Sequence, residues 1–107
     1  MKPIIIHEKP IIVYEPKHTY YYEITAPECS RVYRGRTLCP HLRWSQHNSN
    51  YKAWLNGSKA YCTSYEVLKY PNAKLNVITE KDHTIPEANE YERYFIRSNP
   101  LCVNKRK

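Results

Sequence analysis

The chain has 107 residues, a net charge of +7 and eleven tyrosines against one phenylalanine. This length allows one domain with a modest core, and the balance of apolar and charged residues excludes wholesale disorder. No stretch approaches the roughly 18 apolar residues that a membrane span needs. A strongly basic surface favours a polyanionic partner, either nucleic acid or an acidic protein, and the pattern indicates no membrane partner.

The N-terminal region contains a tandem repeat, in which Lys2–Glu8 is followed at once by Lys9–Glu15. The β-branched runs Ile4–Ile6 and Ile11–Val13 favour extended structure. The prolines that punctuate these runs cannot donate to a sheet ladder. Residues 1–16 are therefore expected to form either short edge strands or an extended arm. Such an edge would support an edge-strand homodimer as easily as a monomer, so the oligomeric state stays open.

The next segments predict two strands and a helical region. The tyrosine-rich segment His18–Thr25 predicts a strand, and a shorter strand is expected around Ser30–Tyr33. Apolar residues then recur at helical spacing, which predicts one helix, or two joined by a kink, over residues 49–70. Asn48 or Ser49 is expected to cap its beginning, and a proline follows its end.

The last third predicts a strand and a helix. Apolar and polar residues alternate over Lys74–Thr79, which is typical of a strand. Pro86 fits the first turn of a helix that continues to about Arg97. Residues 104–107 form a basic tail. Together these elements predict a single α+β domain over residues 1–103, with short N-terminal β-strands, a central helical segment and a C-terminal helix.

The basic residues are concentrated in the middle of the chain, where residues 29–74 contain eight of them and a single acidic residue. Arginine holds phosphates through paired hydrogen bonds, and flat aromatic rings stack on unpaired bases. The candidate nucleic-acid-binding residues are Arg31, Tyr33, Arg34, Arg36, Arg43, Trp44 and Lys52. The alternative is a solvated loop whose Tyr33 and Trp44 point into the core.

Potentially reactive side chains are present, but their spacing predicts no active site. Asp82 and His83 are adjacent, and neighbours on a strand point to opposite faces. Cys39, His41 and His47 have the side chains that zinc prefers, yet their spacing is uncommon for its ligands. We therefore predict no catalytic residue, no metal ligand and no cofactor.

The chain contains four cysteines, Cys29, Cys39, Cys62 and Cys102. The N-terminus lacks the apolar core and cleavage site of a signal peptide. We therefore expect reduced thiols rather than disulfides, and a cytoplasmic location.

A set of aromatic and polar residues at characteristic spacings lies between residues 33 and 96. It consists of Pro40-x-x-x-Trp44, Asn50-Tyr51, Trp54-Leu55, Lys59-Ala60, Cys62, Tyr65 and Tyr91-x-x-Tyr94-Phe95-Ile96. The pattern resembles bacteriophage proteins similar to pyrimidine-dimer DNA glycosylases. The resemblance implies a phage origin and a link to DNA. The helical part that would carry a catalytic glutamate has no counterpart here, because residues 1–28 predict strands, so the resemblance implies no activity.

The leading hypothesis is a small, basic, non-enzymatic nucleic-acid-binding protein. The first alternative is a protein-interaction or inhibitor module that docks on an acidic host protein, with the N-terminal repeats adding a strand to a partner's sheet. The second alternative is a small metalloprotein or a DNA-repair-like enzyme remnant.

Overall fold

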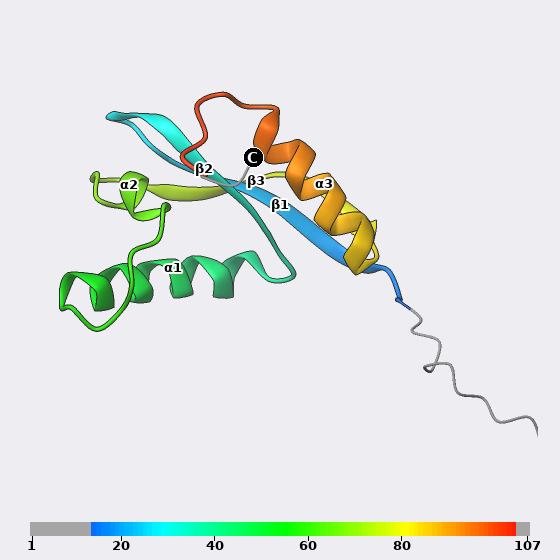
Figure 1. Cartoon of the computed structure of the whole chain (residues 1–107), viewed down its shortest axis with the longest axis horizontal. Helices are drawn as coiled ribbons and strands as arrows, with labels where there is room; N and C mark the ends of the chain where they lie inside the picture. The colour runs from blue at the N-terminus through cyan, green and yellow to red at the C-terminus, as the bar shows by residue number, and fades with distance from the viewer. Residues whose placement is uncertain (1–13, 105–107) are drawn as a thin grey trace, which may run out of the picture.

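The computed structural model describes residues 14–104, and these form one sheet with helices on both faces (Figure 1). The elements follow in the order β1 (Lys17–Ala26), β2 (Cys29–Thr37), α1 (Pro40–Leu55), α2 (Tyr65–Leu68), β3 (Lys74–His83) and α3 (Ile85–Arg97). The strands are antiparallel and lie in the order β2-β1-β3, so β1 is central. The predicted α+β class is confirmed.

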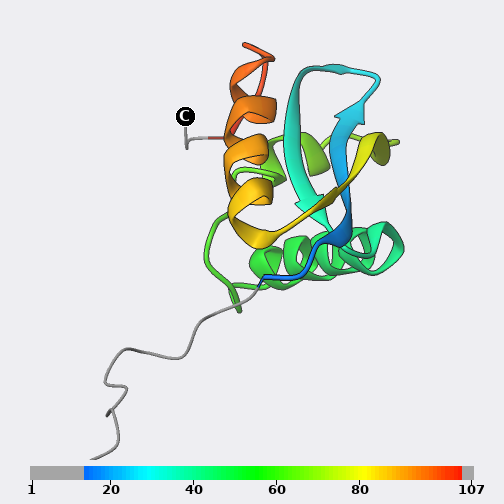
Figure 2. The same cartoon turned by 90° about the vertical axis from the view of Figure 1, so that its right-hand side faces the viewer.

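The two faces of the sheet are covered by different helices. Figures 1 and 2 show α3 along one face and α1 with α2 on the other. Because neighbouring residues on a strand point to opposite faces, β1 serves both layers. The ring of Tyr21 packs against Tyr91 and Phe95 of α3. The ring of Tyr22 lies against His47 of α1 instead.

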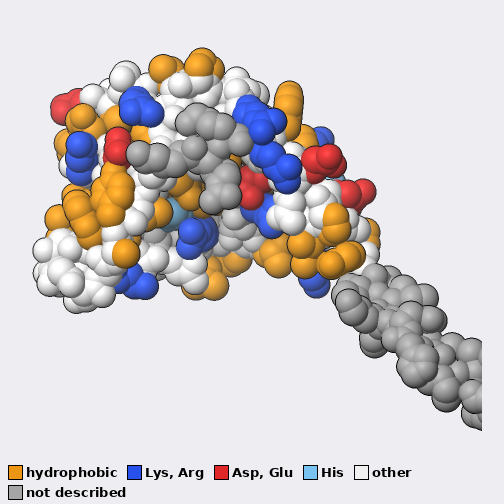
Figure 3. All heavy atoms as spheres, viewed as in Figure 1, with side chains coloured by type: hydrophobic (Ala, Val, Ile, Leu, Met, Phe, Trp, Pro, Cys, Tyr) orange, Lys and Arg blue, Asp and Glu red, His pale blue; other side chains and the backbone are white. Residues whose placement is uncertain are grey.

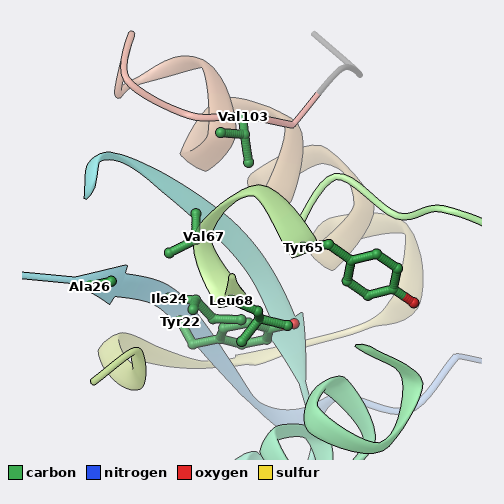
Figure 4. Packing of buried hydrophobic residues seen from close by; sticks show 7 residues of the cluster. All are labelled: Tyr22, Ile24, Ala26, Tyr65, Val67, Leu68 and Val103. Atoms are coloured by element: carbon green, nitrogen blue, oxygen red, sulfur yellow. The ribbon is translucent and has the colours of Figure 1, made fainter. Parts of the chain in front are cut away.

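The main core lies between the sheet and α2. Figure 4 shows the buried residues of this cluster, which are Tyr22, Ile24, Ala26, Tyr65, Val67, Leu68 and Val103. The short helix α2 contributes three of them, so packing rather than length stabilises it. Tyr65 also stacks on Trp54 near the end of α1, with 5.2 Å between ring centroids. This contact joins α1 to the core.

The C-terminal segment covers part of the outer edge of β2. The backbone N–H of Val32 donates to Leu101 O at 3.1 Å, and Val103 N–H donates to Val32 O at 2.7 Å. The side-chain amide of Asn104 continues this ladder. Its Oδ1 accepts from Arg34 N–H at 3.0 Å, and its Nδ2 donates to Arg34 O at 2.7 Å. The edge is therefore paired as far as Arg34.

Several predicted elements are confirmed. The strands expected over His18–Thr25 and Lys74–Thr79 are present, and both run longer than predicted. The strand expected around Ser30–Tyr33 continues to Thr37. The C-terminal helix is present, and its start is fixed by a capping box between Thr84 and Glu87.

The predicted bounds of the central helix are wrong. The helix begins at Pro40, not near residue 49, and it ends at Leu55. A proline in the first turn loses no helical hydrogen bond and supplies a suitable φ, so Pro40 is the start signal. Beyond the helix, Gly57 has a φ of 82°, which favours glycine and separates α1 from α2. The predicted start near residue 49 is two full turns too late. The prediction followed the spacing of apolar residues, and that spacing does not mark the start of α1 because α1 buries only His47.

Two predictions fall outside the described residues. The strands at Ile4–Ile6 and Ile11–Val13 lie there, as does most of the basic tail. Within residues 14–104, no helix combines the length and the apolar content needed to cross a membrane.

Candidate active site

A single glycine of β2 makes room for a tyrosine of β1. Gly35 lies directly opposite Tyr22 in the antiparallel pair. A Cβ at position 35 would stand 2.7 Å from the hydroxyl oxygen of Tyr22 and 2.9 Å from its Cζ, closer than real Cβ contacts. The phenol therefore lies across the backbone of β2 at a place that only glycine permits. Glycine within a strand often marks such a close approach.

The hydroxyl group of Tyr22 is held by two residues of α1. Its oxygen lies 2.9 Å from Nε2 of His47, and Nε of Arg43 donates to the same oxygen at 3.4 Å. Arg43 and His47 are four residues apart and so share one face of the helix. Because Arg43 donates a hydrogen bond to the oxygen, the phenol O–H is free to donate to Nε2 of a neutral imidazole.

Burial sets the protonation states of this pair. It lowers the pKa of His47 to about 4, and the charge of Arg43 acts in the same direction. Burial also raises the pKa of Tyr22, against the opposing effect of Arg43. At neutral pH a protonated phenol therefore faces a neutral imidazole, and this arrangement can pass a proton from Tyr22 to His47.

Tyr33 forms the wall behind this pair. Its ring centroid lies 5.4 Å from that of His47 in an edge-on arrangement, and 6.4 Å from that of Tyr22. Burial raises the pKa of Tyr33, so this phenol stays protonated. The aromatic wall fixes the imidazole and shields it from water.

A carboxylate from α3 reaches the same region. Nη1 of Arg36 lies 3.4 Å from Oε1 of Glu92, and Nη2 donates to Oδ1 of Asn89 at 2.7 Å. Burial raises the pKa of Glu92, while the charges of Arg36 and Arg43 oppose that shift. The charge of Glu92 in turn helps to raise the pKa of Tyr22. Groups from α1 and α3 thus act on one another across β2.

Glu92 is the residue that could hold a divalent cation here. Residues 14–104 contain no group of three His, Cys, Asp or Glu side chains that would form an all-protein metal site. Mg²⁺, however, is commonly bound by one or two carboxylates together with water and substrate phosphates. Glu92 fits such a site, and its partner Arg36 would then be released to the substrate.

Three of the seven predicted nucleic-acid-binding residues come together at this site. They are Tyr33, Arg36 and Arg43. The structure turns Tyr33 toward the interior, but from strand β2 and not from the solvated loop of the alternative interpretation. Arg36 and Arg43 approach the site from opposite sides of β2.

The other four predicted residues lie apart from it. Arg31 donates to the backbone oxygen of Cys102, and Arg34 pairs with Glu23 at 2.8 Å on the α3 face. Trp44 is half-buried and lines a cavity between α1 and β3. Lys52 is exposed in the last turn of α1. Nucleic-acid binding by any of the seven stays a prediction.

A comparison with protein families identifies this arrangement. Residues 18–106 match the GIY-YIG catalytic domain. The chain belongs to the GIY-YIG family. Comparisons with curated proteins and with solved structures give no match. The family name spells Gly-Ile-Tyr and Tyr-Ile-Gly, and we assign these tripeptides to 20–22 and 33–35. On this assignment Tyr22, Tyr33 and Gly35 agree with the family name, and these three residues meet across β1 and β2.

The match corrects the resemblance to glycosylase-like phage proteins over residues 33–96. The GIY-YIG match begins at residue 18 and covers β1, so the catalytic part is not missing. The pattern misled because its residues serve mainly in packing. Trp54 and Tyr65 stack on each other, and Tyr91 and Phe95 cover the other face. Aromatic core positions of this kind occur in many folds.

The match also corrects the leading hypothesis. The GIY-YIG family consists of nuclease catalytic domains, so the expectation of a non-enzymatic binding protein is wrong. Neither the protein-interaction module nor the metalloprotein or repair-enzyme remnant accounts for the match better. Nucleic acid is supported as the partner, since the family acts on it. An acidic protein partner, an edge-strand homodimer, a phage origin and a cytoplasmic location stay predictions.

Three residues of the site were not singled out from the sequence, namely Tyr22, His47 and Glu92. A signal for the first was available, because Gly35 is one of only two glycines and lies inside a strand. The second could have been found from Arg43 and His47, which are four residues apart on one helix. The third had no local signal, because Glu92 resembles the other acidic residues of α3.

Proposed function

We propose that this chain is a nuclease that hydrolyses phosphodiester bonds, with Tyr22, Arg43, His47 and Glu92 as its reacting groups. The observation that carries the proposal is the Tyr22 hydroxyl held between neutral His47 and Arg43. Membership of the GIY-YIG family supports this class of reaction.

Tyr22 and His47 supply a path for the proton of the attacking water. The water loses a proton to the oxygen of Tyr22 while the phenol proton moves to Nε2 of His47, 2.9 Å away. The phenol ends unchanged, and the imidazole becomes charged. Burial disfavours that charge, so His47 releases the proton to solvent after the bond is cut, while the leaving oxygen takes a proton from water.

Arginines of the site stabilise the charge that develops on the phosphate. Arg43 already points its Nε at the reacting phenol. Nη1 of Arg36 is buried, lies 3.4 Å from Glu92 and makes no hydrogen bond within residues 14–104, so it would turn to a phosphate oxygen once a cation took its place on Glu92. A divalent cation on Glu92 would polarise the phosphate and stabilise the leaving oxygen. Donors fixed before the reaction starts are the most effective form of such stabilisation.

The test is cleavage by the purified full chain in the presence of Mg²⁺. The substrates are a circular plasmid, which has no ends, and end-labelled DNA and RNA oligonucleotides. We expect nicking of the plasmid and loss of activity with a chelator. Glu92→Gln should lower the rate by about 100-fold or more. Glu90→Gln is the matched control, because Glu90 lies on the same helix and is exposed. Failure to cut every substrate, or full activity of Glu92→Gln, would refute the proposal.

A further inference from the structure

A cavity opens at one end of the sheet, beside the site described above. It has a volume of about 210 Å³ and lies where β1 begins, β2 ends and α3 starts. Lys17, Arg36, Ile85 and Ala88 of these three elements line it, together with Leu38 just after β2. Arg36 also contacts Glu92, so the cavity adjoins the carboxylate of the active site.

The rim of the cavity is apolar and exposed to water. Leu38 and Ile85 leave 57% and 54% of their surface in solvent, although both line the same hollow. Ala88 is buried in its wall. Figure 3 shows hydrophobic side chains gathered at this end of the molecule. Two aliphatic side chains that face a hollow gain free energy when a flat apolar group covers them.

The remaining lining is polar and includes two cations. Lys17 is exposed at the start of β1, and Arg36 lies between the cavity and Glu92. An apolar hollow with two cations in its lining, one of them in contact with Glu92, suits a group that is flat, weakly polar and attached to an anion. A nucleoside next to its phosphate has this chemistry.

We propose that the cavity holds one nucleobase of the substrate, from the nucleotide next to the phosphate that is cut. This inference rests on the proposed nuclease function. The volume is below the roughly 300–1,000 Å³ of pockets for drug-sized ligands, which suits a group as small as one base. Leu38 and Ile85 contact the faces of the base, and Lys17 contacts a flanking phosphate.

A base in this cavity cannot remain stacked in a duplex. Taking a base out of the stack costs a few kcal/mol, and the cost is smallest for a base that is already unpaired. The enzyme should therefore prefer substrates that carry an unpaired nucleotide beside the cut, such as a mismatch, a flap or a single strand.

The experiment compares two oligonucleotides that differ only in whether one nucleotide is paired. That nucleotide carries 2-aminopurine, whose fluorescence rises when the base leaves the stack. Binding of the full chain is measured with a chelator present, and cleavage is measured with Mg²⁺. We expect the unpaired substrate to bind and to be cut about tenfold better, because it avoids the cost of unstacking.

The double variant Leu38→Ser/Ile85→Ser should lose this preference. The matched control is Ile78→Ser, an isoleucine of β3 that is 48% exposed and lies outside the cavity lining. Equal treatment of both substrates, or a preference that survives the double variant, would overturn the inference while leaving the nuclease function in place. Tight binding of the unpaired substrate without any cleavage would support the cavity and refute the nuclease.

Discussion

Two tyrosine–histidine pairs lie on opposite faces of strand β1. The hydroxyl of Tyr21 is 2.8 Å from Nδ1 of His83, and the hydroxyl of Tyr22 is 2.9 Å from Nε2 of His47. Burial does not distinguish the two tyrosines, because they expose 0% and 1% of their surface. We nevertheless propose different roles for these two adjacent tyrosines, although each has a histidine partner.

The difference lies in what surrounds each pair. The ring of Tyr21 packs edge-on against Tyr91 and Phe95, so its role is to hold α3 on the sheet. The ring of Tyr22 lies over Gly35, and its oxygen also accepts from Arg43. In the proposed mechanism, the cation at its hydroxyl and the glycine beneath its ring make the second tyrosine the reactive one.

The largest expected effect comes from removing one hydroxyl or the other. Tyr22→Phe should lower kcat for nucleic-acid cleavage by about 100-fold or more, because the proton path through the phenol is lost. Tyr21→Phe should leave kcat within about threefold of wild type, because its ring contacts remain. Both rates are measured with Mg²⁺, after thermal unfolding has shown that both variants fold.

The reverse result would reassign the active site. If Tyr21→Phe lost activity and Tyr22→Phe kept it, the reactive pair would be Tyr21 with His83, on the α3 face. Wild-type activity in both variants would mean that neither phenol takes part in the reaction.

The second expected effect is a pH dependence of stability that originates at His47. The unfolded histidine titrates near pH 6.5, and burial lowers the pKa of the folded group to about 4. Between these values the unfolded chain binds a proton that the folded chain does not. The free energy of unfolding should therefore fall as the pH falls from about 6.5 to 4, by about 3 kcal/mol from this group.

His47→Gln isolates that contribution, because an amide keeps a hydrogen bond to Tyr22 but does not titrate. Urea unfolding of wild type and variant is compared from pH 4 to pH 8. The stability of the wild type relative to the variant should fall by about 3 kcal/mol as the pH falls, because only the wild type carries this titration. Parallel curves over the whole range would show that His47 is not held in its neutral form.

The third expected effect concerns the glycine beneath the reactive ring. Gly35→Ala should cost about 1–3 kcal/mol of stability, because its Cβ would stand 2.7 Å from the Tyr22 oxygen. It should also lower cleavage, because the ring must move away from its partners. Gly57→Ala is the control, since its φ of 82° makes it costly although the space around it is open.

These two glycine variants separate stability from chemistry. Urea unfolding should show a loss in both, and cleavage assays below the unfolding transition should show a loss only for Gly35→Ala. If both variants cleaved at the wild-type rate, the close approach of Tyr22 to β2 would have no role in the reaction.

The fold was predictable from local patterns to the extent that each element carries its own signal. The strand predicted over His18–Thr25 shows the hydrophobic period of a strand, and the helix ending at Arg97 shows that of a helix. Pro86 lies in the first turn of this helix. The central helix was misplaced because α1 turns little apolar surface to the sheet. Only His47 is buried on it, so the apolar spacing pointed to a later start than Pro40.

The site was less predictable because its residues come from distant parts of the chain. Tyr22 and Gly35 meet only through the register of a hairpin, and His47 joins them only once α1 crosses the sheet. Glu92 lies some seventy residues after Tyr22. A single sequence shows which residues are basic or aromatic, but it does not show which of them come together. The tertiary fold decides which of them meet: Tyr21 packs against α3, whereas the hydroxyl of Tyr22 meets His47 of α1.

The smallest expected effect concerns the packing of α3 on its face of the sheet. Phe95 is buried against Tyr21, and the guanidinium of Arg34 lies 4.2 Å from its ring centroid. Phe95→Leu should cost about 1 kcal/mol through the lost ring contacts, measured by urea unfolding. Tyr94→Leu on the same helix should cost less, because Tyr94 is 62% exposed. Neither variant should change the cleavage rate, since neither ring touches the Tyr22 network. A fall in that rate without a fall in stability would mean that these α3 side chains position Glu92 for the reaction in addition to packing against the sheet.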